Sequence, residues 1–173
     1  SKPPEEKPSL KYKIAIIIDD VGAGGRLTEK FLQFPLKITF AVLPHLACST
    51  ELAGRIRKLG HEVMLHQPME PLNFKERNIR LSQGEILDEM DGERIISVLE
   101  ENLESVPFAS GINNHQGSKS TASPVTMKIV MKFLKTREMF FIDSVATAQS
   151  VAFRTALESG LRAGRRDIFL DNE

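Results

Sequence analysis

Short runs of β-branched and apolar residues alternate along the chain with longer segments whose apolar residues recur at helical spacing. The first run, residues 12–19, is nearly continuous in isoleucine, which is typical of a strand buried on both faces. We predict five further strands, at residues 37–43, 61–66, 108–113, 139–143 and 166–170. Helices are predicted between them, at residues 26–34, 48–59, 92–105, 123–136 and 148–159. This alternation predicts parallel βαβ units, in an open sheet or in a barrel.

Two segments depart from this rhythm. Residues 1–12 are rich in Pro, Lys and Glu, so we expect a flexible linker or an added tail there, followed by one domain over residues 13–173. Residues 67–90 are long and polar, and loops of this length are usually functional or mobile. Because no apolar run reaches the length of a transmembrane helix, we expect no membrane insertion by this chain.

Composition and charge add only a few constraints. The 23 Lys and Arg residues balance the 23 Asp and Glu residues, so nothing in the charge favours nucleic acid as a partner. Acidic residues gather between Glu85 and Glu104, and basic residues gather late in the chain; we interpret both groups as solvated helix faces. The single cysteine, Cys48, excludes an intramolecular disulfide and fits the cytoplasm and the periplasm equally.

Polar side chains stand at the ends of most predicted strands. In β/α proteins the carboxyl ends of parallel strands share one edge of the sheet, where functional side chains gather. His45, after the second strand, is close enough to this edge to touch a substrate, although a simple loop residue is the alternative. The residues at the other strand ends are Asp19, Asp20, His66, Asn113, Asn114, His115, Asp143 and Asp171.

These strand ends offer ligands for a divalent metal ion. Because side chains alternate along a strand, we expect one of Asp19 and Asp20 to bind a cation and the other to act as a base or orient a ligand; a helix N-cap or turn is the alternative. His61 and His66 are five residues apart and so face opposite sides, which favours His66, at the strand end, for the site. With His115 this makes one carboxylate and two imidazoles, a set that suits Zn²⁺ and leaves positions open for water and substrate. Either histidine alone is more simply a hydrogen-bonded loop residue.

Other chemistries lack their motifs. The histidine spacing is not that of a zinc-protease helix, and the glycines of residues 22–25 lack the Lys-Ser/Thr of a phosphate-binding loop. Asp20 is followed by Val21, so the chain has no D-x-D motif there, and Cys48 stands in no nucleophile motif.

Five strings make the chain resemble a known family: IIIDDVG, GHEVMLHQPMEP, GINNHQGSKST, FFIDSVAT and RRDIFLDN. They are similar to the successive signatures of the divergent polysaccharide deacetylases, a branch of the NodB-like carbohydrate esterases. The resemblance runs from about residue 13 to the end and implies an α/β fold, a deformed (β/α) barrel of the glycoside hydrolase/deacetylase type. Because that family continues beyond FLDN to a further histidine motif, the resemblance also implies that the C-terminal segment that closes the barrel is missing here.

The resemblance also implies individual roles. In the NodB-like enzymes the first motif supplies a catalytic base and then a metal ligand, positions that fall on Asp19 and Asp20. The ligand histidine that follows G-H-E falls on His66. Asp143 is our second catalytic candidate, at the end of the fifth predicted strand.

The sequence departs from the family pattern at two places, and both concern the histidine that supplies the second imidazole to the metal. The usual second histidine of the G-H-E motif is Glu70 here, and the usual arginine–proline motif is replaced by the loop with Asn114 and His115. We therefore infer that His115 supplies the missing imidazole, while Glu70 approaches the metal or hydrogen-bonds around it. The residues expected to contact the substrate or support the metal ligands are Glu70, Asn113, Asn114, His45 and Asp171.

These inferences predict a zinc-dependent hydrolase that removes acetyl groups from a carbohydrate polymer, such as a peptidoglycan-like or chitin-like glycan. By the same resemblance we expect an extracytoplasmic protein, periplasmic or secreted. The first residues contain no apolar signal core, and a targeting segment is expected to have been removed from them. Two alternatives stay open: a catalytically inactive glycan- or metal-binding envelope protein on the same fold, and a structural envelope partner whose polar rim contacts other proteins.

Overall fold

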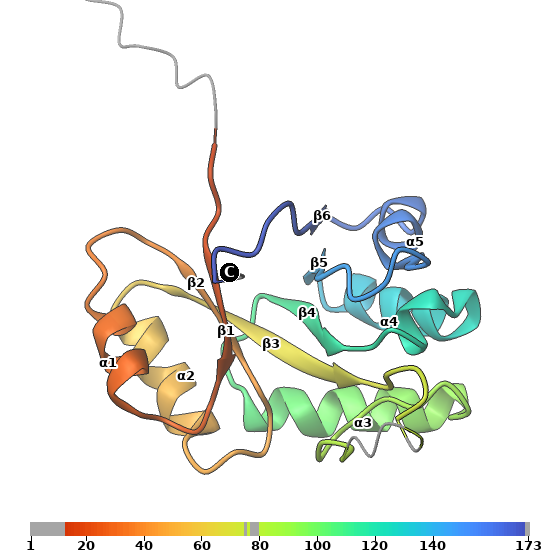
Figure 1. Ribbon diagram of the computed structural model, residues 1–173, viewed down its shortest axis with the longest axis horizontal. Helices are drawn as coiled ribbons and strands as arrows, with labels where there is room; N and C mark the ends of the chain where they lie inside the picture. Colours follow the sequence, from red (N-terminus) through yellow and green to blue (C-terminus); the bar gives the residue numbers. More distant parts are fainter. Residues whose placement is uncertain (1–12, 75, 77–79, 172–173) are drawn as a thin grey trace, which may run out of the picture.

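Six parallel strands form one sheet, in which each strand pairs with the next one along the chain (Figure 1). The computed structural model describes residues 13–74, 76 and 80–171, so the linker expected over residues 1–12 lies outside this part. This consecutive order is that of a barrel, whereas a doubly wound open sheet reverses its order at a switch point. Within the described residues β1 and β6 do not pair, so the barrel is open, and the predicted deformed barrel is confirmed. The strands are β1 (Ile17–Val21), β2 (Thr39–Val42), β3 (Glu62–Met69), β4 (Gly111–Gln116), β5 (Phe140–Asp143) and β6 (Ala163–Arg165).

Helices lie along the outside of this sheet, as Figure 1 shows. Each predicted helix is present, with ends that differ by a few residues. Local signals explain two of the starts: Asp91 accepts a hydrogen bond from the backbone N–H of Arg94, and Ser123 caps a helix that begins with proline. No helix in the described part of the chain is both long and apolar enough to cross a membrane. The helices are α1 (Arg26–Leu32), α2 (Ser49–Lys58), α3 (Gly92–Ser105), α4 (Pro124–Thr136) and α5 (Ala152–Glu158), with a short 3₁₀ helix η1 (Ser120–Ala122).

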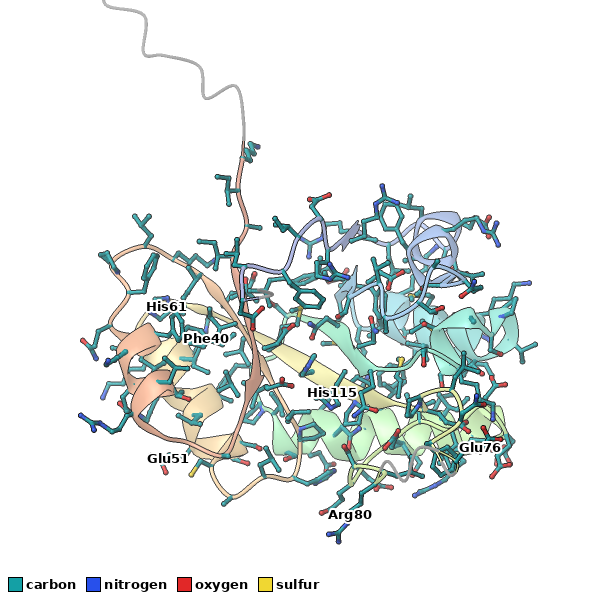
Figure 2. All side chains as sticks on the ribbon, in the orientation of Figure 1. Phe40, Glu51, His61, Glu76, Arg80 and His115 are labelled. Carbon is teal, nitrogen blue, oxygen red and sulfur yellow. The ribbon has the colours of Figure 1, made fainter. Side chains whose placement is uncertain are left out.

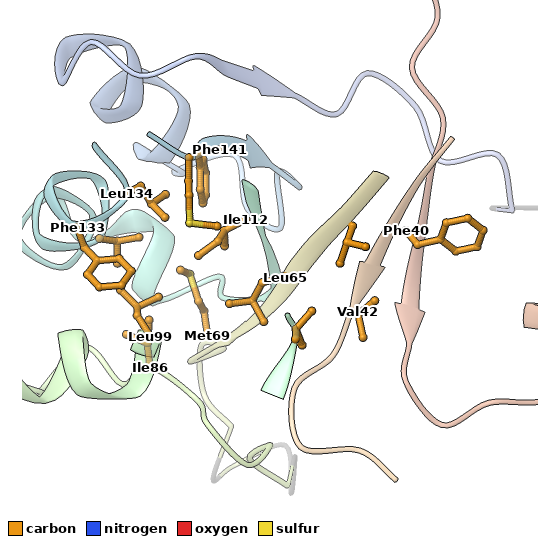
Figure 3. Packing of buried hydrophobic residues seen from close by; sticks show 14 of the residues in the cluster. Phe40, Val42, Leu65, Met69, Ile86, Leu99, Ile112, Phe133, Leu134 and Phe141 are labelled. Atoms are coloured by element: carbon orange, nitrogen blue, oxygen red, sulfur yellow. The ribbon is translucent and has the colours of Figure 1, made fainter. Parts of the chain in front are cut away.

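The core fills the space between the helices and one face of the sheet (Figure 3). Phe40, Leu65, Ile112 and Phe141 are fully buried on this face, one on each of four neighbouring strands. Because side chains alternate along a strand, the residues next to them point to the opposite face. His66 and Asn113 directly follow Leu65 and Ile112, and the apolar core therefore fixes the face on which the polar site must lie.

The sixth strand is displaced from its predicted position. The ladder with β5 uses Ala163–Arg165, and the predicted strand over residues 166–170 is wrong. Arg166 explains why the chain leaves the sheet: its guanidinium donates to the backbone carbonyls of Ser144 and Val145 and lies 3.7 Å from the centre of the Phe169 ring. The β-branched and aromatic residues that suggested a strand are exposed instead, with Ile168 at 70%.

Gly117, directly after β4, has a backbone that only glycine adopts without strain. Its φ is +87°, and an added Cβ would lie 2.8 Å from the Cβ of Met69. We expect Gly117→Ala to lower the stability by about 2 kcal/mol and the melting temperature by about 4–8 °C. Gly54 in α2 is the matched control, because its Cβ would meet nothing within 4 Å and alanine favours a helix, so Gly54→Ala should raise the melting temperature slightly. Equal melting temperatures for the two variants would contradict this account.

Candidate metal centre

A bulge in β1 brings two adjacent carboxylates to the same side of the sheet. Ile18 pairs with Phe40 and Val21 pairs with Val42, so Asp19 and Asp20 together stand opposite a single residue of β2. Asp20 has a φ of 57°, in the left-handed region that aspartate tolerates better than most residues. The expectation that these two side chains point in different directions is therefore wrong, because it assumed a regular strand.

Asn113 links Asp19 to His66 through both ends of its side-chain amide. Its Nδ2 donates to Asp19 Oδ1 at 2.9 Å, and its Oδ1 lies 2.8 Å from His66 Nδ1. Since the amide NH₂ already serves Asp19, the oxygen must accept from His66, which places the imidazole proton on Nδ1. His66 Nε2 is then the nitrogen that faces Asp20 and His115, and its lone pair is available to a metal ion when this nitrogen carries no proton.

Asp20, His66 and His115 bring one potential ligand atom each to a common point. Asp20 Oδ1 lies 3.2 Å from His66 Nε2 and 3.0 Å from His115 Nδ1, and the two nitrogens are 3.1 Å apart. In a tetrahedral zinc site with bonds of about 2.0–2.1 Å, two ligand atoms stand about 3.3–3.4 Å apart. The spacing and the donor set of two nitrogens and one oxygen therefore fit a zinc-sized cation after small adjustments.

Charge and burial at this cluster also suit a cation. Hydrogen bonding to His115 and then to His66 holds the pKa of the Asp20 carboxyl well below its ordinary value, although partial burial opposes this. Asp20 is therefore ionised at neutral pH, the form that binds a metal ion. His66 is buried at 3% exposure, whereas the Asp20 side chain is 66% exposed, so the cluster has a rigid inner wall and an open outer side. Figure 2 shows His115 over the ends of β3 and β4.

The remaining histidines lie apart from this cluster. His61 is buried against Phe40, with its ring nitrogens near Ile38 N and Leu32 O, so it packs at the start of β3, on the opposite face from His66 as expected (Figure 2). His45, a substrate candidate, hydrogen-bonds through Nε2 to Asn102 of α3 at 2.7 Å. It therefore belongs to the support of a loop, and any contact with substrate stays a prediction.

Asn102 is a functional candidate that the sequence analysis missed. Its Oδ1 faces His45, and its Nδ2 donates to Gln67 Oε1 and to the backbone carbonyl of Gly84, each at 2.8 Å. It thus ties α3 and β3 to the loop after β2 and to the segment that follows residue 80. The sequence did contain a signal for it: Asn102 is a polar residue three positions after Leu99, on the apolar stripe of the predicted helix, and a buried amide needs hydrogen-bond partners.

Glu70 lies outside the cluster of potential ligands. The residue is 4% exposed, and its carboxylate pairs with Lys119 Nζ at 2.7 Å and accepts a hydrogen bond from the backbone N–H of Asp88 at 2.8 Å. Of the two predicted roles, approach to the metal has no support in this geometry. Glu70 instead holds the end of β3 to the segments that border the site.

Asn114 faces away from Asn113, as alternation along β4 requires. Its Nδ2 donates to the carbonyl of Gln116 and its Oδ1 accepts from the backbone N–H of Ser144, both at 2.8 Å. Both ends of this buried amide are therefore used to hold the ends of β4 and β5 together. The structure gives Asn114 this supporting place and no direct contact with the ligand cluster.

Asp143, the second catalytic candidate, is a loop-stabilising residue in the structure. It is 2% exposed; Oδ1 accepts from the backbone N–H of Val145, and Oδ2 accepts from Ser150 Oγ at 2.7 Å and from the N–H of Phe153. These bonds fix the turn between β5 and α5, on the other face from His66. Asp171, expected at the end of the sixth strand, stands instead on an exposed segment beyond β6.

Asn113 should matter to metal affinity even though it is not itself a ligand. Asn113→Ala removes the partner that orients His66, so we expect Zn²⁺ affinity to fall by about 10- to 100-fold in a competition titration with a chromogenic chelator. Asn114→Ala is the contrasting variant, because it should lower the melting temperature and leave the affinity nearly unchanged. Equal affinity losses in the two variants would show that Asn113 acts only through general stability.

Comparison with known sequences finds a matching family model and two similar proteins. A sequence model described as divergent polysaccharide deacetylase matches residues 16–173. The uncharacterised protein YibQ of Escherichia coli (strain K12) is 36% identical over 165 residues, which are 95% of this chain and 50% of that protein. An uncharacterised protein of Haemophilus influenzae (strain ATCC 51907 / DSM 11121 / KW20 / Rd) is 31% identical over 160 residues, 92% of this chain and 56% of that protein. The chain thus spans about half the length of these relatives.

Two solved structures share the fold. The uncharacterised protein ATU2773 from Agrobacterium tumefaciens C58 superposes with a TM-score of 0.83 at 22% identity, over 92% of this chain and 64% of that chain. A lactam utilization protein from Thermus thermophilus superposes with a TM-score of 0.62 at 12% identity, over 89% of this chain and 66% of that chain. At such identities the likeness concerns the fold alone.

Proposed function

This chain belongs to the divergent polysaccharide deacetylase family, and we propose that it is a metal-dependent hydrolase that removes acetyl groups from a carbohydrate polymer. The observation that supports this most is the convergence of Asp20, His66 and His115, with the Asp19 carboxylate held beside them by Asn113. Zn²⁺ is the expected cation, because two imidazoles and one carboxylate are ligands of catalytic zinc sites.

The residues of the chain suit the steps of such a reaction. A divalent ion held by Asp20, His66 and His115 would polarise the acetyl carbonyl and acidify a water molecule. Asp19 would take the proton of the attacking water: its Oδ1 is engaged by Asn113, and Oδ2 has no partner among the described residues. Asn113 thus positions the base and a metal ligand at once, and it couples the geometry of the two groups.

The reaction is tested by acetate release from acetylated glycans. We expect the zinc-loaded protein to release acetate from chito-oligosaccharides or from peptidoglycan fragments, a chelator to stop the release, and added Zn²⁺ to restore it. Both substrates are assayed, because the family indicates a carbohydrate without naming the polymer. A zinc-loaded protein that binds such a glycan and releases no acetate from either substrate would contradict the enzyme and favour the binding protein on the same fold.

We propose an extracytoplasmic location on the same grounds, since polymers of this kind belong to the cell envelope. The lone Cys48 is compatible with such a location, because the fold needs no disulfide there. Fractionation of cells that carry the tagged, full-length gene product is the direct measurement. Recovery in the cytoplasmic fraction alone would contradict the proposal.

A further inference from the structure

Glu85 is a buried acidic residue to which the proposed reaction gives no role so far. The residue is only 8% exposed, so its interpretation as part of a solvated acidic face is wrong. One carboxylate oxygen, Oε2, accepts a hydrogen bond from the backbone N–H of Ser82. Buried carboxyl groups are costly unless paired or neutral, and Glu85 has no cationic partner among the described residues.

The pairing of the next residue shows which face Glu85 occupies. Ile86 forms a parallel bridge with Met69, its N–H donates to the carbonyl of Pro68, and both Ile86 and Met69 are fully buried in the core. By alternation Glu85 and Pro68 share the opposite face, the face of the metal cluster. Pro68 is in register with His115 on β4. His115, Pro68 and Glu85 therefore form a row across one face.

A cavity of about 300 Å³ opens next to this row, with Pro68 in its wall. Its other walls are the loop over residues 43–46 and the segment over residues 80–83, which contains the hydrogen-bond partner of Glu85. In Figure 2 the labels of His115 and Arg80 mark the metal cluster and one wall of the cavity. The volume is at the lower end of small-ligand sites and suits one sugar ring. The contacts of Asn102 hold the two walls in place.

This arrangement defines where the bond to be cleaved would lie. With the sugar unit in the cavity and its acetyl group at the cluster of Asp20, His66 and His115, the bond between them passes over Pro68. In the row described above, Glu85 is the neighbour of Pro68. Removal of an acetyl group from nitrogen requires a proton for the departing amine, and Asp143 is engaged elsewhere.

We propose that Glu85 donates the proton to the leaving group, an assignment that rests on the proposed deacetylase function. Asp19 takes one proton from water as the hydroxyl adds to the acetyl carbon. When the carbon–nitrogen bond breaks, its electron pair stays on nitrogen, and the proton of the Glu85 carboxyl forms the new N–H bond. Acetic acid, which ionises to acetate in solution, and the amine leave, and exchange with solvent returns a proton to Glu85 and removes one from Asp19.

The environment of Glu85 favours the acid form that this step needs. Burial raises the pKa of the Glu85 carboxyl, and the charge of Glu70 adds to this, while the Ser82 N–H and His115 act in the opposite direction. Since Oε2 accepts from the Ser82 N–H, the other oxygen, Oε1, is the one left to carry the proton.

The test compares leaving groups of different basicity. Glu85→Gln keeps the shape and an oxygen for the Ser82 N–H but removes the acid. We expect turnover of an N-acetylated oligosaccharide to fall by about 10²-fold and hydrolysis of 4-nitrophenyl acetate, whose leaving group needs no proton, to stay within about threefold. Zinc affinity, measured by chelator competition, should be unchanged. Glu89→Gln is the control, an exposed acidic residue of the same segment that should leave both rates unaltered.

Each outcome decides one question. Equal losses on both substrates, or no loss on the oligosaccharide, would overturn the assignment of Glu85 while the hydrolase stands. Absence of acetate release from both substrates by the zinc-loaded wild type would overturn the deacetylase proposal and Glu85 with it. Should Glu85→Gln fail to fold, Glu85→Asp decides, because it keeps an acid but moves it away from the leaving group. If Glu85→Asp slows hydrolysis of the oligosaccharide more than hydrolysis of 4-nitrophenyl acetate, this supports Glu85 as the proton donor. An unchanged ratio of the two rates overturns that role.

Discussion

Replacing His66 by alanine is expected to lower the affinity of the protein for Zn²⁺ by about 10³-fold. Structural zinc sites with four ligands bind with about 10–16 kcal/mol, so each ligand accounts for about 3–4 kcal/mol, or two to three powers of ten in affinity. His66 should lie at the upper end, because it is buried and its orientation is fixed by Asn113. Competition with a chromogenic chelator measures the affinity directly.

Thermal unfolding gives an independent measure of the same effect. Zinc that binds only the folded state at 100 times its dissociation constant stabilises the protein by about 2.7 kcal/mol, so the wild type should melt higher with zinc than with a chelator. His66→Ala and His115→Ala should lose this difference, whereas His45→Gln should keep it, because His45 bonds to α3. Unchanged zinc affinity in His66→Ala would exclude the proposed centre.

Asp19→Asn is expected to reduce turnover by about 10³-fold while zinc affinity stays close to that of the wild type. Asparagine keeps the oxygen that accepts from Asn113, so the position of His66 is preserved and only the basicity is lost. Acetate release and zinc titration on the same preparation separate the two effects.

The neighbouring residue provides the matched comparison. Asp20→Asn weakens a ligand that both histidines contact, so it should lose zinc affinity first and turnover as a consequence. If Asp19→Asn lost zinc as strongly as Asp20→Asn, the division into base and ligand would be wrong. If Asp19→Asn kept full turnover, another group would have to accept the proton of water.

Periodicity was sufficient to predict the order of strands and helices, because most helices bury one apolar stripe and most strands contain or directly follow a short apolar run. The family resemblance turned this order into a deformed barrel, which the consecutive parallel pairing confirms. The sixth strand was misplaced because residues 166–170 have a higher β-strand propensity than residues 163–165. In the structure, the hydrogen bonds of Arg166 to two backbone carbonyls direct the chain away from the sheet.

Only part of the candidate site could be predicted from the sequence. Residues at the ends of β3 and β4 were selected correctly as neighbours, since alternation and register decide which side chains meet. Asp143 was selected by the same logic and turned toward α5, because one position along a strand reverses the face. The bridge through Asn113 and the burial of Glu85 depend on contacts between distant segments, and no local pattern carries them.

In the bulge of β1, two residues stand opposite one residue of β2. The proposed metal centre therefore depends on the number of residues in β1 as well as on their identity. Loss of a single residue there would restore a regular ladder and leave only one acid on the side of the histidines. A homologous chain one residue shorter at this point would keep nearly the same letters in an alignment and yet be unable to bind an ion and deprotonate water together. Insertions and deletions in β1 are thus expected to affect this chemistry as strongly as substitutions of the two aspartates.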